Sequence, residues 1–297
     1  MKEKFYHFLE KNIFYLYFFL NLFHERRRNF KYIRKFYANC NQKEFLKFDY
    51  EILKENKKSD TLFILGSGAS INNISDEMWK HIKQNDSFGF NFWLLHEHIP
   101  NYYMFEPPIK KNQELMFNLI KNRANDYLKN NTFFIMKDVK TLKIKCDKIP
   151  KNIRKNFMAA PKDNFYGNSR ASFIKSITLA KKFGFIYDNV LYSRRASLFS
   201  AIFFGWRMGY KNIILTGVDL NNTDYFYDDS KIYDQNFVPE NPKRGKIHST
   251  VKEINTDFSI NELIYMIKEG LLDKDNVKLF VLNPKSLLAQ KLPTYSI

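Results

Sequence analysis

The stretch 61-TLFILGSGAS-70 gives the clearest indication of the fold class, because an apolar run ends there at two closely spaced glycines. The run has the length and β-prone composition of a buried strand. Gly66 and Gly68 permit a tight turn, after which the N-terminus of a helix can face an anion. We therefore expect a strand, a turn and a helix, with a nucleotide phosphate as the first candidate ligand.

The turn does not match the dinucleotide-binding fingerprint. Ile71 stands where that fingerprint needs a third glycine, and no acidic residue closes the second strand. The second apolar stretch, 87-SFGFNFW-93, carries Asn91, and the third, 102-YYMFEPP-108, ends on Glu106. Taken alone, the glycine pair favours an ordinary strand-to-helix turn.

Alternation along the chain predicts an α/β, doubly wound, Rossmann-like nucleotide-binding domain. Helical patterns separate several of the expected strands, which lie at 61–65, 87–92, 101–105, 132–136, 212–218 and 277–282. Ligands of such sheets bind at the carboxyl ends of the strands. Gly66, Ser67, Gly68, Asn91, Glu106 and Asp219 follow four different strands, so we expect them to meet in one crevice.

Composition limits the domain count and the partners. A chain of 297 residues with 44% hydrophobic content is sufficient for one principal domain. The net charge of +17 indicates an acidic partner: nucleic acid, an anionic membrane or a phosphorylated substrate. Cys40 and Cys146 provide neither a disulfide framework nor a metal-binding spacing, which favours reduced thiols in a cytoplasmic protein.

Residues 1–56 are expected to form a basic, aromatic, helical extension before the main domain at 57–297, with a polar hinge, 54-KENKKSD-60, between them. The apolar stretch Asn12–Phe23 would make about 18 Å of helix, too short for a hydrocarbon core of roughly 30 Å. It also lacks the cleavage site of a signal peptide. Basic residues follow it: Arg26, Arg27, Arg28, Lys31, Arg34 and Lys35.

Two interpretations of this extension stand equal. The helix lies on the anionic surface of the inner membrane, or it packs on the core or on another subunit of a homo-oligomer. Nucleic acid ranks third as a partner, because the basic residues form no recognition motif.

The segment 221–250 is too long for a simple connection, and its tyrosines favour a lid over a bound substrate. His248, near its end, is a candidate general base. His96 and His98 have a spacing that can bind zinc, but no third ligand is apparent, so a surface loop is the favoured interpretation.

The stretch 193-SRRASLFSAIFFGWRMGYKNIILTGVDL-220 predicts a helix whose polar start, with two arginines, can bind a phosphate or carboxylate. A strand then runs to Asp219. The only Asp-x-Asp sequence, at 273–275, precedes the last strand and so falls at the wrong end of the sheet for catalysis. We therefore expect no metal cofactor.

That stretch, together with 224-DYFYD-228, 247-IHST-250 and 283-NPKSLLA-289, resembles in order the segments of the bacterial lipooligosaccharide sialyltransferases of glycosyltransferase family 42. Segments 62-LFILGSGAS-70 and 89-GFNF-92 fit the first two strands of that family. The resemblance implies a GT-A-like variant of the Rossmann-like fold and a CMP-sugar donor. It also implies inversion at the anomeric carbon, no metal, and a flexible lid.

By this resemblance, Ser67 and Asn91 would contact the nucleotide, and Arg194 with Ser197 would lie near the phosphate and sugar of the donor. His248 would take the proton from the acceptor hydroxyl. Ser67 replaces an asparagine of the family.

Two lid tyrosines of the family stabilise the departing phosphate. Tyr225 matches one, whereas Asn221 stands at the other position, where Tyr227 or Tyr233 could substitute. Glu106 also replaces a family asparagine. A carboxylate near an anionic donor must be protonated or paired, so Glu106 would face a sugar hydroxyl, the ribose or a cation.

These departures leave open which CMP-activated group is transferred: sialic acid, a related nonulosonic acid or another group. Two alternatives from other functional classes also stand. The chain could be a non-catalytic nucleotide-binding or membrane-assembly module on the same fold, or a basic nucleic-acid-binding protein.

Overall fold

The computed structural model describes residues 9–10, 12–107, 110–137, 146–241, 244–247, 249–252 and 258–297, apart from the side chains of 42, 110 and 111. In these ranges eight strands form one sheet in which every pair of neighbours is parallel. Their order is β1 (Leu46–Lys47), β6 (Phe157–Ala159), β5 (Phe133–Met136), β4 (Tyr102–Phe105), β3 (Asp86–Phe90), β2 (Thr61–Leu65), β9 (Asn212–Thr216) and β10 (Lys278–Val281). The six predicted strands are confirmed.

The chain reverses its direction of travel across the sheet between β2 and β9. From β2 it proceeds through β3, β4, β5 and β6 toward one edge, and later returns to place β9 and β10 on the other side. In the register of the central pair, Thr61 lies opposite Asn212 and Leu65 opposite Thr216. A reversal of this kind opens a crevice at the carboxyl ends of the two strands.

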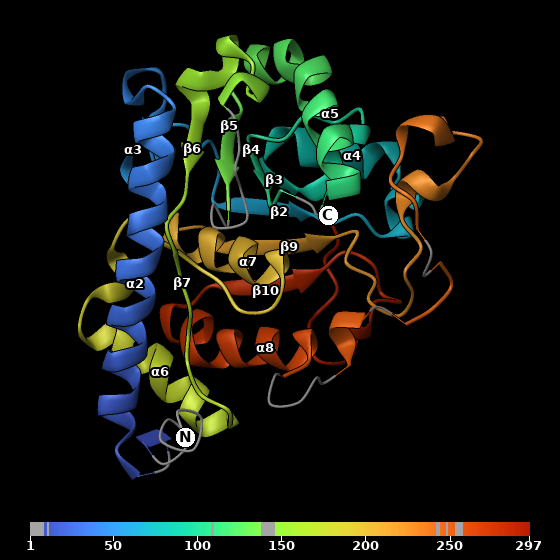
Figure 1. Ribbon diagram of the computed structural model, residues 1–297. Coiled ribbons are helices and arrows are strands. Elements are labelled where there is room, and N and C mark those ends of the chain that lie inside the picture. Colours follow the sequence, from blue (N-terminus) through green and yellow to red (C-terminus); the bar gives the residue numbers. More distant parts are fainter. Residues whose placement is uncertain are drawn as a thin grey trace.

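Helices cover both faces of the sheet, which confirms the doubly wound architecture (Figure 1). One face carries α4 (Asp76–Gln84) and α5 (Lys110–Lys129), and the other carries α6 (Arg170–Lys182), α7 (Ser197–Arg207) and α8 (Ile260–Ile267). Side chains of β2 alternate between the two cores: Leu62 and Ile64 pack on one side, Phe63 and Leu65 on the other. A strand buried on both faces is apolar throughout, as the sequence of β2 is.

The remaining strands and one short helix are local additions. A separate parallel pair joins β7 (Lys162–Asp163) to β8 (Leu191–Tyr192), and α3 (Tyr50–Lys54) precedes β2.

The N-terminal helix α2 (Phe14–Asn39) packs one of its sides on the body of the protein, along the edge of the sheet (Figure 1). Its buried residues are Phe14, Tyr17, Phe18, Leu22, Asn29, Ile33, Phe36 and Tyr37. Arg26 lies on this inner side, where its Nε is 2.6 Å from the carboxylate of Asp163 in β7. Arg26 therefore does not belong to the exposed basic surface in which we expected it.

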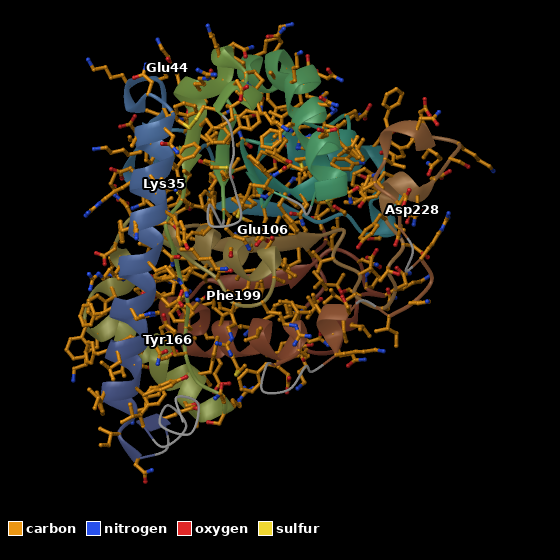
Figure 2. All side chains as sticks on the ribbon, in the orientation of Figure 1. Lys35, Glu44, Glu106, Tyr166, Phe199 and Asp228 are labelled. Carbon is orange, nitrogen blue, oxygen red and sulfur yellow. A yellow bond between two sulfur atoms is a disulfide. The ribbon has the colours of Figure 1, made fainter. Side chains whose placement is uncertain are left out.

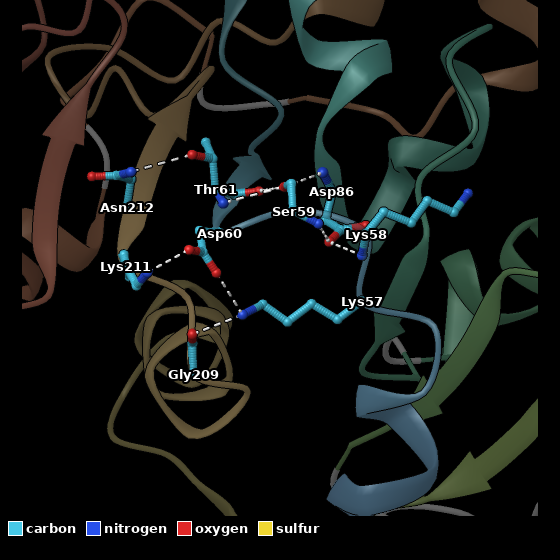
Figure 3. Close-up of polar contacts among 9 residues, drawn as sticks. All are labelled: Lys57, Lys58, Ser59, Asp60, Thr61, Asp86, Gly209, Lys211 and Asn212. Atoms are coloured by element: carbon cyan, nitrogen blue, oxygen red, sulfur yellow. Dashed lines mark hydrogen bonds and ion pairs between the residues drawn. The ribbon is translucent and has the colours of Figure 1, made fainter.

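The predicted hinge before β2 is held by hydrogen bonds (Figure 3). The buried carboxylate of Asp86 accepts the backbone N–H groups of Lys58 and Ser59 at 2.8 and 3.0 Å. The Lys57 Nζ lies 3.1 Å from Asp60 Oδ1. In addition, β1 within the N-terminal 56 residues pairs with β6 of the sheet. A functional boundary after residue 56 stays a prediction.

Cys40, at the end of α2, and Cys146 form a disulfide with a Cα–Cα separation of 5.3 Å. The expectation of two reduced thiols is therefore wrong for this structure. Sequence spacing could not reveal the pair, because 106 residues separate the two cysteines.

Candidate active site

A cavity of about 630 Å³ lies at the carboxyl ends of β2, β3, β4 and β9. Eight of the residues predicted from the sequence line it: Gly66, Ser67, Gly68, Asn91, Glu106, Ser197, Asp219 and Tyr225. Figure 2 shows Glu106 near the middle of the molecule, with Asp228 of the lid segment to its right. Residues from well-separated parts of the sequence thus lie together at the carboxyl ends of the strands, as expected for a sheet of this kind.

The glycines of the β2 turn are required by the neighbouring turn after β9. A Cβ atom on Gly66 would lie 2.5 Å from the carbonyl oxygen of Gly217, and one on Gly68 would lie 2.4 Å from a carboxylate oxygen of Asp219. Both separations are far below contact distance, so no larger residue fits without movement of the β9 turn. The two turns form adjoining walls of the cavity.

The backbone N–H groups of Gly66, Gly68, Ala69 and Ser70 are already used within the protein. Gly66 donates to Thr216 O at 2.7 Å, and Gly68 donates to Gly217 O at 2.8 Å. The following helix is a 3-10 helix of only five residues, Ala69–Asn73. The prediction that a helix N-terminus after this turn binds a phosphate is therefore wrong. What the turn contributes to the cavity is Ser67.

Asp219 serves the same junction. Its buried carboxylate accepts hydrogen bonds from the backbone N–H and hydroxyl of Ser70, at 3.0 and 2.6 Å, and from Asn283 Nδ2 at 2.7 Å. These contacts tie the β9 turn to both of its neighbours. Asp219 therefore has a structural role at the cavity wall.

Asn91 ends β3 in the left-handed region, with φ of 55°. Asparagine tolerates this conformation better than most residues with a side chain. Its carbonyl oxygen accepts a hydrogen bond from the hydroxyl of Tyr103 on β4, which fixes the turn.

The start of α7 contributes the electropositive end of the site. Ala196 occupies the N-cap position without a side-chain hydrogen bond, and Ala196, Ser197 and Leu198 all line the cavity. Amide N–H groups at a helix start lack partners within the helix and carry partial positive charge. The predicted anion-binding function of this helix start is thus compatible with its position.

Lys137, which we did not predict, lies 2% exposed directly after β5. Its Nζ is 3.3 Å from Glu106 Oε2 and 3.3 Å from Ser197 Oγ. The requirement that Glu106 be paired is therefore met by a lysine of the protein. The same carboxyl-end rule that identified Glu106 could have identified Lys137.

The two arginines before α7 differ in their positions. Arg194 donates to Phe165 O at 3.3 Å and is not among the residues that line the cavity. Arg195 does line it, with φ of 62°, and its guanidinium donates to the carbonyl groups of Ser249, Lys252 and Phe258. The geometry therefore favours Arg195 over the predicted Arg194 as the arginine at the cavity.

The lid segment is docked on the β2 turn. Tyr225 forms an antiparallel bridge with Gly68, and the rings of Tyr225 and Tyr227 stack with centroids 5.1 Å apart. Burial raises the pKa of both hydroxyl groups, so both carry their proton at neutral pH. Tyr227 lines the cavity, whereas Tyr233 does not and packs against Phe226. Of the two candidates for the second tyrosine, Tyr227 has the better position.

Two further predicted residues lie elsewhere. Asn221 donates to Lys285 O at 3.2 Å and lines a neighbouring cavity of about 720 Å³. His248 lies outside the described residues, so its predicted role as a base stays a prediction.

His96 and His98 lie in the loop after the 3-10 helix Asn91–Leu95, as expected, but His96 is buried and His98 is half-buried. The His96 ring is 7% exposed and stacks on Trp79 and Trp93, at 4.9 and 4.5 Å between centroids. Burial lowers the pKa of His96 to about 3 and that of His98 to about 4. Both are neutral at physiological pH.

Within the described ranges, no three His, Cys, Asp or Glu side chains gather in an arrangement that could hold a metal ion. The Asp273–Asp275 pair precedes β10, as predicted.

Fold and site together define an α/β protein with a cavity at the point where the strand order reverses. No family model matches the sequence, and no curated protein matches it.

Several solved structures of Campylobacter jejuni enzymes are similar in fold. One is an alpha-2,3-sialyltransferase in apo form, with 18% identity and a TM-score of 0.45, covering 81% of this chain and 82% of that one. Another is the monofunctional alpha-2,3-sialyltransferase Cst-I, with 17% identity and a TM-score of 0.43, covering 80% and 81%. A third is the sialyltransferase CstII in complex with cytidine 5′-monophosphate, with 17% identity and a TM-score of 0.40, covering 80% and 85%.

Proposed function

We propose that this protein is an inverting, metal-independent glycosyltransferase. It moves sialic acid or a related nonulosonic acid from a CMP-activated donor to a surface glycan, lipooligosaccharide or capsule. The observation that supports this proposal is the convergence of eight predicted residues on one cavity at the reversal point of the sheet.

The cavity has the size and chemistry that such a donor needs. Ligand sites commonly enclose about 300–1,000 Å³, and this cavity of about 630 Å³ falls within that range. Ser67 and Asn91 offer polar contacts to the nucleotide. The start of α7 and the protonated hydroxyls of Tyr225 and Tyr227 can stabilise the negative charge that develops on departing CMP.

The reaction is a direct displacement. An acceptor oxygen forms a bond to the anomeric carbon while the bond from that carbon to the phosphate oxygen breaks, and CMP leaves with the electron pair. His248 takes the proton of the acceptor hydroxyl. Arg195 binds the carbonyls of Ser249 and Lys252, the described residues that follow His248 in the chain.

Calorimetric titration with CMP, CDP, UDP and NAD, with and without EDTA, tests the nucleotide site. We expect selective binding of cytidine nucleotides that EDTA does not change. Tyr227→Phe should weaken CMP binding, whereas the matched variant Tyr233→Phe should not, because only Tyr227 lines the cavity. Preference for UDP or NAD, or no binding, would refute the proposal.

Turnover separates an enzyme from a binding module. His248→Ala should lower transfer to a glycan acceptor by roughly 10²–10⁴-fold and leave CMP binding nearly unchanged. Nucleotide binding without turnover in the native protein would identify a non-catalytic module. Salt-sensitive binding of DNA or RNA without nucleotide selectivity would identify a nucleic-acid-binding protein.

We further propose that the outer side of α2 binds the cytoplasmic surface of the inner membrane. Exposed apolar side chains recur at positions 13, 16, 20, 23 and 30, a spacing that puts them on one side of a helix. The exposed basic residues Arg27, Lys31, Arg34 and Lys35 accompany them, and Figure 2 labels Lys35 on this helix. An aromatic and basic helix surface of this kind suits an anionic leaflet.

None of the helices in the described ranges is long and apolar enough to cross a membrane. Vesicle sedimentation tests peripheral binding: the protein should bind vesicles containing phosphatidylglycerol and leave pure phosphatidylcholine vesicles in solution. Leu16→Ser/Phe23→Ser should abolish this binding, whereas Phe237→Ser, an equally exposed residue of the lid segment, should not. If the molar mass measured by light scattering instead rises with protein concentration, and this rise is lost in the Leu16→Ser/Phe23→Ser variant, the outer side of α2 is the interface of a homo-oligomer.

A further inference from the structure

Glu106, Lys137 and Ser197 form a closed triangle at the wall of the cavity. The Lys137 Nζ, the Glu106 Oε2 and the Ser197 Oγ are each 3.3 Å from the other two. The Lys137 side chain is 2% exposed and that of Glu106 is 40% exposed. The lysine is thus buried behind the carboxylate, and the carboxylate is the part that a ligand can reach.

The hydrogen bonds in this triangle run from Lys137 through Ser197 to the carboxylate. Lys137 donates to the Ser197 hydroxyl, and that hydroxyl donates to Glu106 Oε2. A serine hydroxyl has a single hydrogen, so Ser197 has no further hydrogen to offer a ligand. The other carboxylate oxygen, Oε1, takes no part in the triangle.

Lys137 also explains how a carboxylate is tolerated at this point of the cavity. Breaking a buried ion pair leaves a charge uncompensated, whereas an intact pair balances it within the protein. Glu106 therefore has its counter-charge within the protein. It presents a fixed acceptor to the ligand.

An ionised carboxylate only accepts hydrogen bonds. A hydroxyl or an amide N–H of a ligand therefore gains a charge-assisted hydrogen bond at Oε1, while a carboxylate at the same point is repelled. We propose that Glu106 and Lys137 form a subsite for hydroxyl groups of the transferred sugar, whose own carboxylate lies elsewhere in the cavity. This inference rests on the proposed function for its assumption of a CMP-activated donor.

Calorimetric comparison of CMP with the non-transferable analogue CMP-3-fluoro-N-acetylneuraminic acid tests the subsite. Glu106→Gln keeps the shape of the side chain and removes its charge. We expect this variant to bind the analogue at least about tenfold more weakly than the native protein does, with CMP affinity unchanged within about twofold. Tighter or unchanged binding of the analogue would overturn the subsite.

Glu240→Gln is the matched control, because Glu240 is another carboxylate that lines the cavity. It should leave the ratio of analogue affinity to CMP affinity unchanged. An equal effect of the two substitutions would show a general charge effect and would overturn the specific role of Glu106.

The outcomes also separate the two proposals. Failure of the native protein to bind CMP overturns the proposed function, and the subsite falls with it. Normal CMP binding with tighter binding of the analogue to Glu106→Gln overturns the subsite alone.

Discussion

Removing the Arg26 guanidinium should destabilise the protein far more than its place on a basic helix suggests. Arg26 is 15% exposed and contacts Asp163, which is 1% exposed, through its Nε at 2.6 Å. Loss of one partner from a buried ion pair costs about 3–5 kcal/mol, because the other charge remains in the interior. We expect Arg26→Met to lower the free energy of unfolding by about 3 kcal/mol at pH 7.5.

The loss should shrink in mild acid. Burial raises the pKa of the Asp163 carboxyl to about 6 even with Arg26 present, and removal of Arg26 raises it further. A group with a raised folded pKa destabilises the folded state increasingly as pH rises above its unfolded pKa, near 3.9. At pH 5 Asp163 is mostly protonated with or without Arg26, so the difference in stability between the variant and the native protein becomes small.

Urea unfolding at the two pH values measures both quantities. Arg170→Met is the matched control, because the Arg170–Glu269 pair is more than half exposed on both sides and should contribute no more than about 0.5–1 kcal/mol. Arg26→Met/Asp163→Leu should recover most of the lost stability. An Arg26→Met loss as small as that of the control, or one equal at both pH values, would refute a buried pair.

Three further outcomes follow from the described contacts. The folded protein keeps His96 and His98 neutral below pH 6.5, the ordinary pKa of histidine, so its free energy of unfolding should fall by about 1 kcal/mol for each histidine between pH 6.5 and 5.5. Urea unfolding of His98→Asn should show a smaller dependence on pH. Identical pH profiles of the variant and the native protein would contradict this expectation. Gly68→Ala should lower the free energy of unfolding by about 1–3 kcal/mol, because its methyl group overpacks against Asp219. An unchanged melting temperature would show that the β2 and β9 turns can move apart without cost. Arg195→Lys should make the segment around Ser249, Lys252 and Phe258 more sensitive to limited proteolysis, because a lysine lacks the planar guanidinium that bonds their three carbonyl groups. An unaltered cleavage rate would show that Arg195 does not hold this segment in place.

The sequence was sufficient for the strands that are long enough to form an apolar run. Five of the six predicted strands lie in the interior of a sheet covered on both faces, and β10 is an edge strand with Leu279 and Val281 buried. The missed strands β1, β6, β7 and β8 have only two or three residues each. Such short strands have no periodicity of their own, and they exist because distant segments pair with them.

At the candidate site, the rule that ligands bind at the carboxyl ends of strands predicted correctly which residues lie together, but it did not predict what each residue does there. Gly66 and Gly68 lie where expected, but their N–H groups bond to the β9 segment, which no local pattern reveals. Arg194 and Arg195 are adjacent in sequence, and no local pattern distinguishes the one that lines the cavity, Arg195. Lys137 was missed because a lysine after a strand ordinarily reaches solvent.

The neighbouring positions of β2 and β9 also bear on how the protein is made. The register pairs Leu62 with Ile213, so about half of the chain must be synthesised between the two members of the central strand pair. Long-range parallel pairing is slow to form and leaves strand edges open in the meantime. Until residue 216 has emerged, a nascent chain can pair β2 with β3 but leaves its other edge bare. Because the β2 and β9 turns form adjoining walls of the cavity, the binding site is among the last parts of the molecule to be completed.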